Sequence, residues 1–293
     1  MKLKKFSLLL AGLMVFLAAC SSSNTNQSGG STTTGNNSNA GTTNEASTDS
    51  GNSYELVTPG KITYGVAATY PPFEYMENEQ YVGFDIEFME LIAKELGLEV
   101  EIVAMNFDGL IPALQGKRID LINSAMFITD ARAEQVDFVK YMGIGRSIVV
   151  PAGNEQGITS MESLSGKTVA VTRGAIEEVY VTEFNEELKS QGVEQITILA
   201  LPTANDAVLA TENGRADAFL HSSPGAAYLM EERAGVFEIA HTMDSGTQIG
   251  IAVNKGESEL AQAISEAVDS LVKQGVYFKL MEKYNLPFEM SIF

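Results

Sequence analysis

Cysteine and histidine are nearly absent from this sequence, which has one of the former and two of the latter. So few thiols and imidazoles exclude an intrachain disulfide and argue against a transition-metal site, which is usually built from several such ligands. Basic residues are also scarce: 19 lysines and arginines stand against 38 aspartates and glutamates, for a formal net charge of −19 at pH 7. Such an acidic chain is poorly suited to nucleic acid or anionic lipid headgroups. No Ser-His-Asp set is recognisable, and we predict no enzyme, no metal and no cofactor.

Long apolar runs are also missing, except at the N-terminus. Three lysines within the first five residues precede an apolar run of 14 residues, Phe6–Ala19. This run is long enough for the core of a signal peptide and too short to span a bilayer. It ends in Leu17-Ala18-Ala19-Cys20, and small residues directly before a lone cysteine resemble a bacterial lipoprotein signal.

The lipoprotein resemblance implies that residues 1–19 are a signal peptide, that cleavage occurs before Cys20 and that its sulfur carries a diacylglyceryl group. The protein is then expected on the extracytoplasmic face of the cell membrane, held there by its lipid. Loss of three lysines takes the formal charge from −19 to −22. The alternative is an ordinary secretory signal followed by an incidental cysteine.

Residues 20–54 are predicted to form a disordered tether. They consist mainly of Ser, Asn, Thr and Gly, and they have too little apolar surface to offset the entropy of ordering. Such a tether has a root-mean-square reach of roughly 30 Å.

Beyond the tether, strand and helix patterns alternate, which favours a parallel α/β fold. Asp108 is predicted to cap one of the helices. Strands are predicted at 61–66, 99–104, 119–122, 168–171, 196–199 and 216–220, and helices at 84–96, 109–115, 176–189 and 205–213.

The alternation restarts after Pro151, so we predict two lobes. Lobe 1 is assigned to residues 55–147 plus 247–293, and lobe 2 to residues 148–246. Extended stretches at 146–150 and 248–253 flank the second unit, and an amphipathic helix at 260–275 is expected to pack back on the first. Two hinge crossings and a ligand cleft between the lobes follow from this arrangement.

Several motifs then fall in the order and spacing of a known family. The chain from about residue 61 to 293 resembles an extracellular solute-binding protein of an ABC importer, polar amino-acid type (family 3). The resemblance implies a periplasmic-binding-protein-like fold of type II, a small-molecule ligand, an ABC permease in the membrane as partner, and a monomer. The motifs are Tyr70-Pro71-Pro72-Phe73-Glu74, Val82-Gly83-Phe84-Asp85, Phe107–Leu114, Ile128–Arg132, Gln135–Phe138, Leu164–Val171 and Gly214–Ala218.

The resemblance makes Arg132 the anchor for a ligand carboxylate, and a guanidinium suits that role through two parallel charge-assisted hydrogen bonds. The alternative is a surface arginine paired with Asp130 or Glu134. Ser124 and Ala125 follow a strand and are expected to present backbone N–H groups to the same carboxylate.

Aromatic rings are expected to flank the ligand. Tyr70 and Phe107 occupy the positions that the resemblance gives to such rings, and Phe73 lies close by in sequence. The alternative for each is an ordinary core aromatic.

Three departures from the family pattern point to an unusual ligand. Phe127 and Gly174-Ala175-Ile176 stand where hydroxyl-bearing residues are usual, and Ser222 stands where an aspartate usually pairs with the α-ammonium. A cation with few N–H donors can instead sit against aromatic faces. We therefore favour a ligand with a substituted or delocalised cation, such as an ectoine, a betaine or an opine. An ordinary amino acid stays open, because Glu74 or Asp244 can replace the missing acid.

Two further polar residues have open roles. Arg173, beside Gly174, is a candidate for a second ligand carboxylate, or it pairs with Glu177 on its own helix. His221 lies before Ser222 at a strand end, where it touches the ligand or makes a structural hydrogen bond.

The sequence thus predicts a substrate-binding lipoprotein that captures a small carboxylate-bearing zwitterion by cleft closure. One alternative is an ordinary polar amino-acid-binding protein, and another is a sensory protein. A third is a cyclohexadienyl-dehydratase-like enzyme on the same fold, with Glu74, Glu177 or Glu178 as its acid.

Overall fold

The computed structural model describes residues 54–293. The predicted signal peptide, Cys20 and the tether up to residue 53 lie outside the described residues. Within residues 54–293, no helix combines the length and the apolar character needed to cross a bilayer.

One sheet of eight strands, in the order β4-β1-β5-β10-β6-β9-β7-β8, runs through the fold. A separate hairpin is formed by β2 and β3. The strands of the sheet are β1 (Lys61–Val66), β4 (Glu99–Ala104), β5 (Leu121–Ile122), β6 (Val136–Pro151), β7 (Thr168–Thr172), β8 (Thr197–Leu201), β9 (Ala218–Ser222) and β10 (Phe237–Asn254). The hairpin strands are β2 (Tyr75–Glu77) and β3 (Gln80–Val82).

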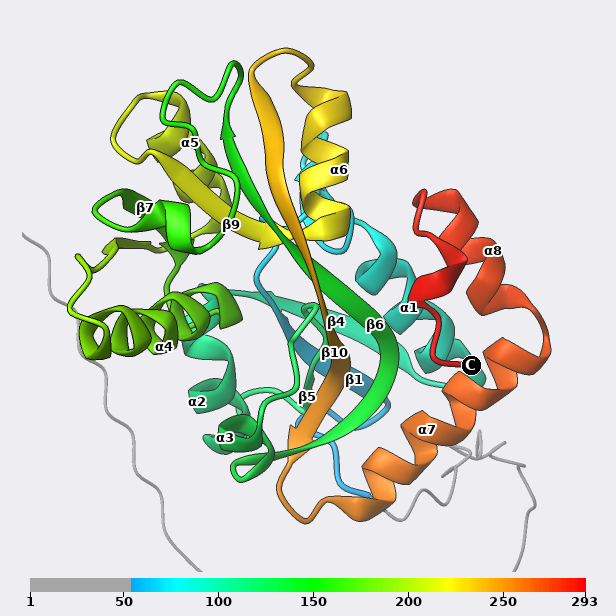
Figure 1. Cartoon of the computed structure of the whole chain (residues 1–293). Helices are drawn as coiled ribbons and strands as arrows, with labels where there is room; N and C mark the ends of the chain where they lie inside the picture. The colour runs from blue at the N-terminus through cyan, green and yellow to red at the C-terminus, as the bar shows by residue number, and fades with distance from the viewer. Residues whose placement is uncertain (1–53) are drawn as a thin grey trace, which may run out of the picture. The chain divides into compact units, whose positions relative to one another are not determined.

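Helices cover both faces of the sheet in the first lobe (Figure 1). Alternate residues such as Tyr64 and Ile251 pack against α1 (Phe84–Glu95), α7 (Ser258–Lys273) and α8 (Val276–Lys283). Their neighbours face the other way and pack against α2 (Leu110–Gln115), which follows a short 3-10 turn, η1 (Phe107–Gly109). A short helix, α3 (Asp130–Ala133), precedes β6. The period of two along each strand therefore separates two apolar cores.

The second lobe repeats this layering. Ile148 and Leu220 pack under α4 (Ile176–Ser190), whereas Val149 and Phe219 face α5 (Ala204–Glu212) and α6 (Ser223–Glu232). Two short 3-10 turns complete the described elements, η2 (Glu162–Leu164) in this lobe and η3 (Phe288–Met290) near the C-terminus.

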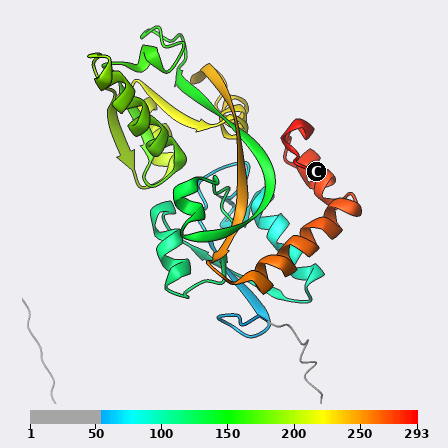
Figure 2. The ribbon, with the colours of Figure 1, turned by 60° about the horizontal axis from the view of Figure 1, so that its bottom comes forward.

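Two long antiparallel strands connect the lobes. Figure 2 shows β6 and β10 running side by side from one lobe to the other. Each of the two strands also pairs with a shorter strand near its C-terminal end: β10 pairs with β5 in lobe 1, and β6 pairs with β9 in lobe 2. Their register shifts between the pairs Met243–Arg146 and Thr247–Ile144, so the ladder is irregular where the strands cross. Irregular pairing of this kind bends strands and is suited to a hinge.

Most predicted elements are confirmed, with boundaries displaced by up to two residues. The two crossing strands, β6 and β10, are longer than predicted. One half of each strand lies in lobe 1 and the other half in lobe 2, so the strand as a whole does not show a single alternation of polar and apolar residues. The N-cap prediction for Asp108 is wrong: Asp108 lies inside η1, and Gly109 precedes α2 without a side-chain cap. Neither the β2–β3 hairpin nor α6 and α8 was predicted.

Candidate functional site

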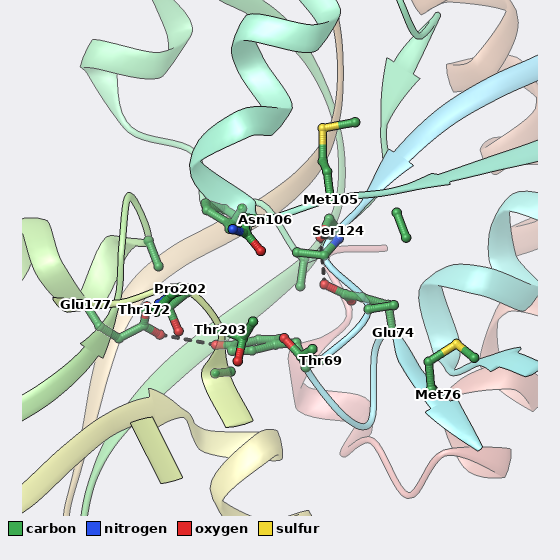
Figure 3. A pocket seen from close by; sticks show the side chains of 18 of the residues that line it. Thr69, Glu74, Met76, Met105, Asn106, Ser124, Thr172, Glu177, Pro202 and Thr203 are labelled. Carbon is green, nitrogen blue, oxygen red and sulfur yellow. Dashed lines mark hydrogen bonds between the residues drawn. The ribbon is translucent and has the colours of Figure 1, made fainter. Parts of the chain in front are cut away.

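A cavity of about 300 Å³ lies between the two lobes. Figure 3 shows Glu74 and Glu177 on opposite sides of it. Lobe 1 contributes Ala67, Ala68, Thr69, Tyr70, Glu74, Met76, Tyr81, Ala104, Met105, Asn106, Phe107, Ser124, Ala125 and Phe127. Lobe 2 contributes Thr172, Ala175, Ile176, Glu177, Pro202, Thr203 and Ala204.

Most of these residues stand at the carboxyl ends of parallel strands, where open α/β sheets usually bind ligands. Ala67–Tyr70 follow β1, Met105–Phe107 follow β4, and Pro202–Ala204 follow β8. The cavity is largely apolar, and two buried carboxylates are its ionisable groups besides tyrosine.

The segment Tyr70–Glu74 is a compact turn in which the Tyr70 N–H donates to the Glu74 carbonyl at 2.7 Å. The turn directs Tyr70 and Glu74 to the cavity and Phe73 away from it. Phe73 is fully buried in the lobe 1 core, with its ring edge-on to Phe84 at 6.4 Å. The predicted ligand contact of Phe73 is therefore replaced by core packing, the alternative stated from the sequence.

Glu74 has an unsatisfied oxygen in the cavity wall. The Ser124 hydroxyl donates to its Oε1 at 2.8 Å, whereas Oε2 is buried without a hydrogen-bond partner. Burial, followed by the nearby charge of Asp85, raises the pKa of Glu74 well above its usual range. A buried carboxyl with a vacant oxygen is favourably placed to receive a cationic donor.

Asp85 lies beneath the cavity wall and holds two groups in position through hydrogen bonds. It accepts the Ala125 N–H at 2.6 Å and the Tyr141 hydroxyl at 2.8 Å. The N–H of Ala125 is thereby taken, so the prediction that it binds a ligand carboxylate is not supported. Ala125 adopts φ +40°, a left-handed conformation that aims this N–H at Asp85. The hydroxyl of Ser124 also accepts the Ala67 N–H at 3.0 Å, which ties two wall segments together.

The stability of the protein is expected to depend on pH through Asp85. Burial raises its pKa to about 7 in the folded protein, against about 3.9 in an unfolded chain. Between these two pKa values the folded protein keeps a proton on Asp85 that the unfolded chain has lost. The contribution of Asp85 to the free energy of unfolding is therefore fully present below about pH 4 and is lost as the pH rises through 7. The loss is at most about 1.4 kcal/mol per pH unit.

Urea unfolding of the protein and of Asp85→Asn at pH 5 and pH 8 checks this prediction. The asparagine variant should lose less stability over that interval, with a residual slope from Glu74, whose raised pKa acts with the same sign. An equal slope in both proteins would contradict it.

Tyr70 bridges the two lobes. Its hydroxyl donates to Glu177 Oε1 at 3.1 Å and accepts the Ser222 N–H at 3.1 Å. The ring lies against His221 with centroids 4.5 Å apart. Burial raises the pKa of Glu177, while the charges of Arg146 and Arg132 oppose that rise.

Arg132 makes a second bridge between the lobes. Its Nη1 donates to the Phe127 carbonyl at 2.7 Å, and its Nη2 reaches the Gly174 carbonyl of lobe 2 at 2.8 Å. The guanidinium also lies 5.3 Å from the Phe107 ring centroid. Neither Asp130 nor Glu134 pairs with it among the ion pairs of residues 54–293, so the alternative of a surface pair is wrong.

Gly174 permits this close approach of the lobes. It has φ +73°, and an added Cβ would lie 3.0 Å from the Asp108 Cβ of lobe 1. The structure is therefore closed, with backbone of lobe 2 seated on η1. Burial lowers the pKa of Arg132 to about 10, which leaves the guanidinium charged at neutral pH.

Of the other residues predicted for the site, some line the cavity and some do not. Phe127 and Ala175 line the cavity, as the predicted site requires. The Arg173 side chain is exposed and off the cavity wall. His221 is buried, and burial lowers its pKa to about 4, so it is neutral at pH 7. The Ser222 hydroxyl accepts the Gly225 N–H at 3.2 Å and caps α6, which leaves its backbone N–H to face Tyr70.

Several wall residues were not predicted from the sequence. Met76 and Tyr81 come from the unpredicted hairpin, and Thr172 and Thr203 from strand ends that the carboxyl-end rule would have identified. Arg146, which is buried beside Ser222 and does not line the cavity, was also not predicted, because a single arginine in an extended stretch usually lies at the surface.

The chain is similar to known proteins both in sequence and in fold. A family model described as bacterial extracellular solute-binding proteins, family 3, matches residues 62–287. A probable histidine-binding protein of Campylobacter jejuni is 29% identical over 240 residues, which cover 82% of this chain and 90% of that protein. An L-arginine-binding protein of Pseudomonas aeruginosa is 33% identical over 233 residues, covering 76% of this chain and 87% of that protein. The solved structure of an ancestral arginine-binding protein bound to arginine matches with a TM-score of 0.71 and 38% identity, covering 77% of this chain and 98% of that one.

Proposed function

Because the chain belongs to the bacterial extracellular solute-binding proteins of family 3, we propose that it captures an amino acid or a close derivative for an ABC importer. We further propose that the ligand carries a positive group in addition to its carboxylate. Closure of the two lobes over the ligand is the signal presented to the permease.

The observation that carries this proposal is the unpartnered Oε2 of Glu74 in the wall of an interlobe cavity. Glu177 provides a second carboxylate on the opposite wall, and the rings of Tyr70 and Phe107 line the space between them. Buried carboxylates and aromatic faces together suit a cation, because both lower its energy outside water. The relatives named as histidine- and arginine-binding proteins agree with such a ligand.

Arg132 is the proposed partner of the ligand carboxylate. A guanidinium has five N–H donors, and the carbonyls of Phe127 and Gly174 take two of them. The remaining donors suit a carboxylate. The same side chain can therefore hold the ligand and latch the lobes, which would couple occupancy to closure.

A second ligand class is favoured by Ser222. The Ser222 hydroxyl caps α6, and serine has no carboxylate. The lobe 2 side of the cleft therefore has no negative group at this position to pair with an ammonium. A substituted or delocalised cation, as in an ectoine, a betaine or an opine, needs fewer acceptors and can rest against Tyr70, Phe107 and Phe127. These ligands belong in the same test as the ordinary amino acids.

The remaining assignments are also proposals. We propose a lipid anchor at Cys20 and an extracytoplasmic, monomeric protein, in keeping with the extracellular family. Lobe boundaries near residues 148 and 246 agree with the part of β6 and β10 where their register shifts. The matched family describes solute-binding proteins, which supports binding without catalysis.

Thermal unfolding of protein stripped of ligand by unfolding and refolding tests the proposed function. The panel holds the twenty amino acids, ectoines, betaines, opines and prephenate. A ligand at 100 times its Kd stabilises the protein by about 2.7 kcal/mol, which gives a clear shift. Shifts with arginine, lysine or histidine support a cationic amino acid, and shifts with the substituted zwitterions alone support the second class. A panel without any shift would overturn the proposal, and conversion of prephenate would favour an enzyme.

A further inference from the structure

A third contact between the lobes lies beside the cavity. The ring of Tyr75, on β2 of lobe 1, has its centroid 5.7 Å from that of Tyr228, on α6 of lobe 2, and the ring planes are tilted by 55°. Both side chains are half-buried, and neither lines the cavity. Tilted aromatic pairs at this separation are favourable beyond the area that they bury. Tyr70 and Arg132 join the lobes through hydrogen bonds, whereas this pair joins them through its rings.

The β2–β3 hairpin has Tyr75 on one face and a part of the cavity wall on the other. Met76 is the ladder partner of Tyr81, so their side chains share one face of the hairpin, and both line the cavity. Tyr75 precedes Met76 in the strand and therefore points to the opposite face. Figure 3 shows Met76 beyond Glu74, on the side of the cavity away from Glu177. The hairpin is thus the wall of the cavity at this end, and its outer face is the one that contacts α6.

The hairpin also forms the least firmly held part of the cavity rim. The exposed lining residues are Met76 and Tyr81 of the hairpin, at 48% and 37% exposed, together with Ala104 and Asn106 at the end of β4. β4 belongs to the eight-stranded sheet, whereas β2 and β3, at three residues each, form a sheet of their own. A two-stranded hairpin is only marginally stable by itself. A contact from lobe 2 therefore matters more to this wall than to the rest of the rim.

Helix α6 connects the tyrosine pair to the bridge at Tyr70. Ser222, whose N–H donates to the Tyr70 hydroxyl at 3.1 Å, is the N-cap of α6, and Tyr228 lies in the same helix. On the lobe 1 side, Tyr70 and Tyr75 flank the compact turn that ends at Glu74. Both contacts join the same two short segments of the chain. Closure that forms the Tyr70 bridge therefore also brings Tyr228 to Tyr75.

We propose that Tyr228 is a positioning residue of the ligand site, which on closure holds the β2–β3 hairpin against the cavity through Tyr75 and thereby slows the release of the ligand. This inference rests on the proposed function and concerns the kinetics of the same site. Because the two rings belong to different lobes, their contact is lost when the lobes separate. The pair should therefore lengthen the lifetime of the closed complex and leave both the rate of ligand entry and the choice of ligand unchanged.

Stopped-flow measurement of L-arginine binding and release, followed by tyrosine fluorescence, tests the inference. Tyr228→Ala should raise the dissociation rate about 2- to 10-fold, the factor expected for one aromatic pair, with an unchanged association rate. Tyr75→Ala should raise it by a similar factor, and the double variant by no more than either single variant, because all three lose the same contact. Tyr228→Phe, which keeps the ring, should behave like the unmodified protein.

The control is Tyr54→Ala, at a half-buried tyrosine of lobe 1 that does not line the cavity. This variant should keep both rates. The ratio of the affinities for arginine and histidine should also be the same in Tyr228→Ala as in the unmodified protein, since a residue that touches the ligand would change that ratio. If another member of the panel binds and arginine does not, the same rates are measured with that member.

The outcomes separate the inference from the proposed function. A purely structural role predicts that Tyr228→Ala lowers the melting temperature of the ligand-free protein and leaves the dissociation rate unchanged, which would overturn the inference and leave the binding function intact. Additive effects of the two alanine substitutions would also overturn it, because the rings would then act independently. Absence of binding by the whole panel would overturn both.

Discussion

Replacing Arg132 by alanine should reduce ligand affinity by at least about 100-fold, the largest effect expected for any single side chain of the cleft. The change removes the proposed carboxylate partner together with two charge-assisted hydrogen bonds, each worth about 1.5–3 kcal/mol. It also leaves the carbonyl oxygens of Phe127 and Gly174 without the donor that joins them across the lobes. Affinity from calorimetry and lobe closure from small-angle scattering check this expectation.

The two roles of Arg132 can be separated by a lysine variant. Arg132→Lys keeps the positive charge but has no planar fork, so it can satisfy a carboxylate or the Gly174 carbonyl but not both well. Compared with Arg132→Ala, the lysine variant should regain part of the ligand affinity, while its lobes should remain less closed than those of the unmodified protein in the absence of ligand. An Arg132→Ala protein that binds ligand within threefold of the unmodified protein would contradict the anchor and the latch alike.

Replacing Glu74 by glutamine should weaken a cationic ligand by about 10- to 100-fold at pH 8 while stabilising the ligand-free protein or leaving it unchanged. The loss follows from removing the charged acceptor of a buried hydrogen bond, worth about 1.5–3 kcal/mol. The ligand-free protein should tolerate glutamine, because the carboxyl is buried and its Oε2 has no partner to lose. Calorimetric titration and thermal unfolding of the two proteins measure these effects.

The same substitution should abolish a pH dependence of binding. The raised pKa of Glu74 means that its carboxyl is protonated below that pKa, and a cation prefers the ionised form. Cation binding therefore releases a proton, and affinity should rise with pH until the carboxyl is ionised. The control is Glu266→Gln on the exposed face of α7, which should keep both the affinity and its pH dependence. A Glu74→Gln protein with unchanged affinity at pH 8 would contradict a cationic ligand at this position.

Local patterns predicted the architecture well because they depend on neighbouring residues. The alternation of strand and helix periods led to the correct α/β class, and a combination of motifs led to the correct family of solute-binding proteins. Tyr70 and Phe107 were placed in the site by the same motifs, and Phe127 as a departure from the family pattern; all three line the cavity. The wrong predictions also came from local patterns. Asp108 is a residue type that commonly caps helices, but in the structure it lies within η1 and not at the N-cap of α2.

The sequence by itself determined the type of most elements, though not of the β2–β3 hairpin, α6 or α8. It also determined the two-lobed class and the residue types available to the cleft, because periodicity and motif spacing depend on residues close together in the chain. Only the tertiary structure decided which charges have partners. Arg132 reaches a carbonyl 42 residues away in sequence, and the Tyr70 hydroxyl meets an N–H 152 residues away. Glu74 and Arg146 are buried with an unpartnered atom each. Such pairings depend on how closely two lobes approach, and no local pattern in a sequence encodes that distance.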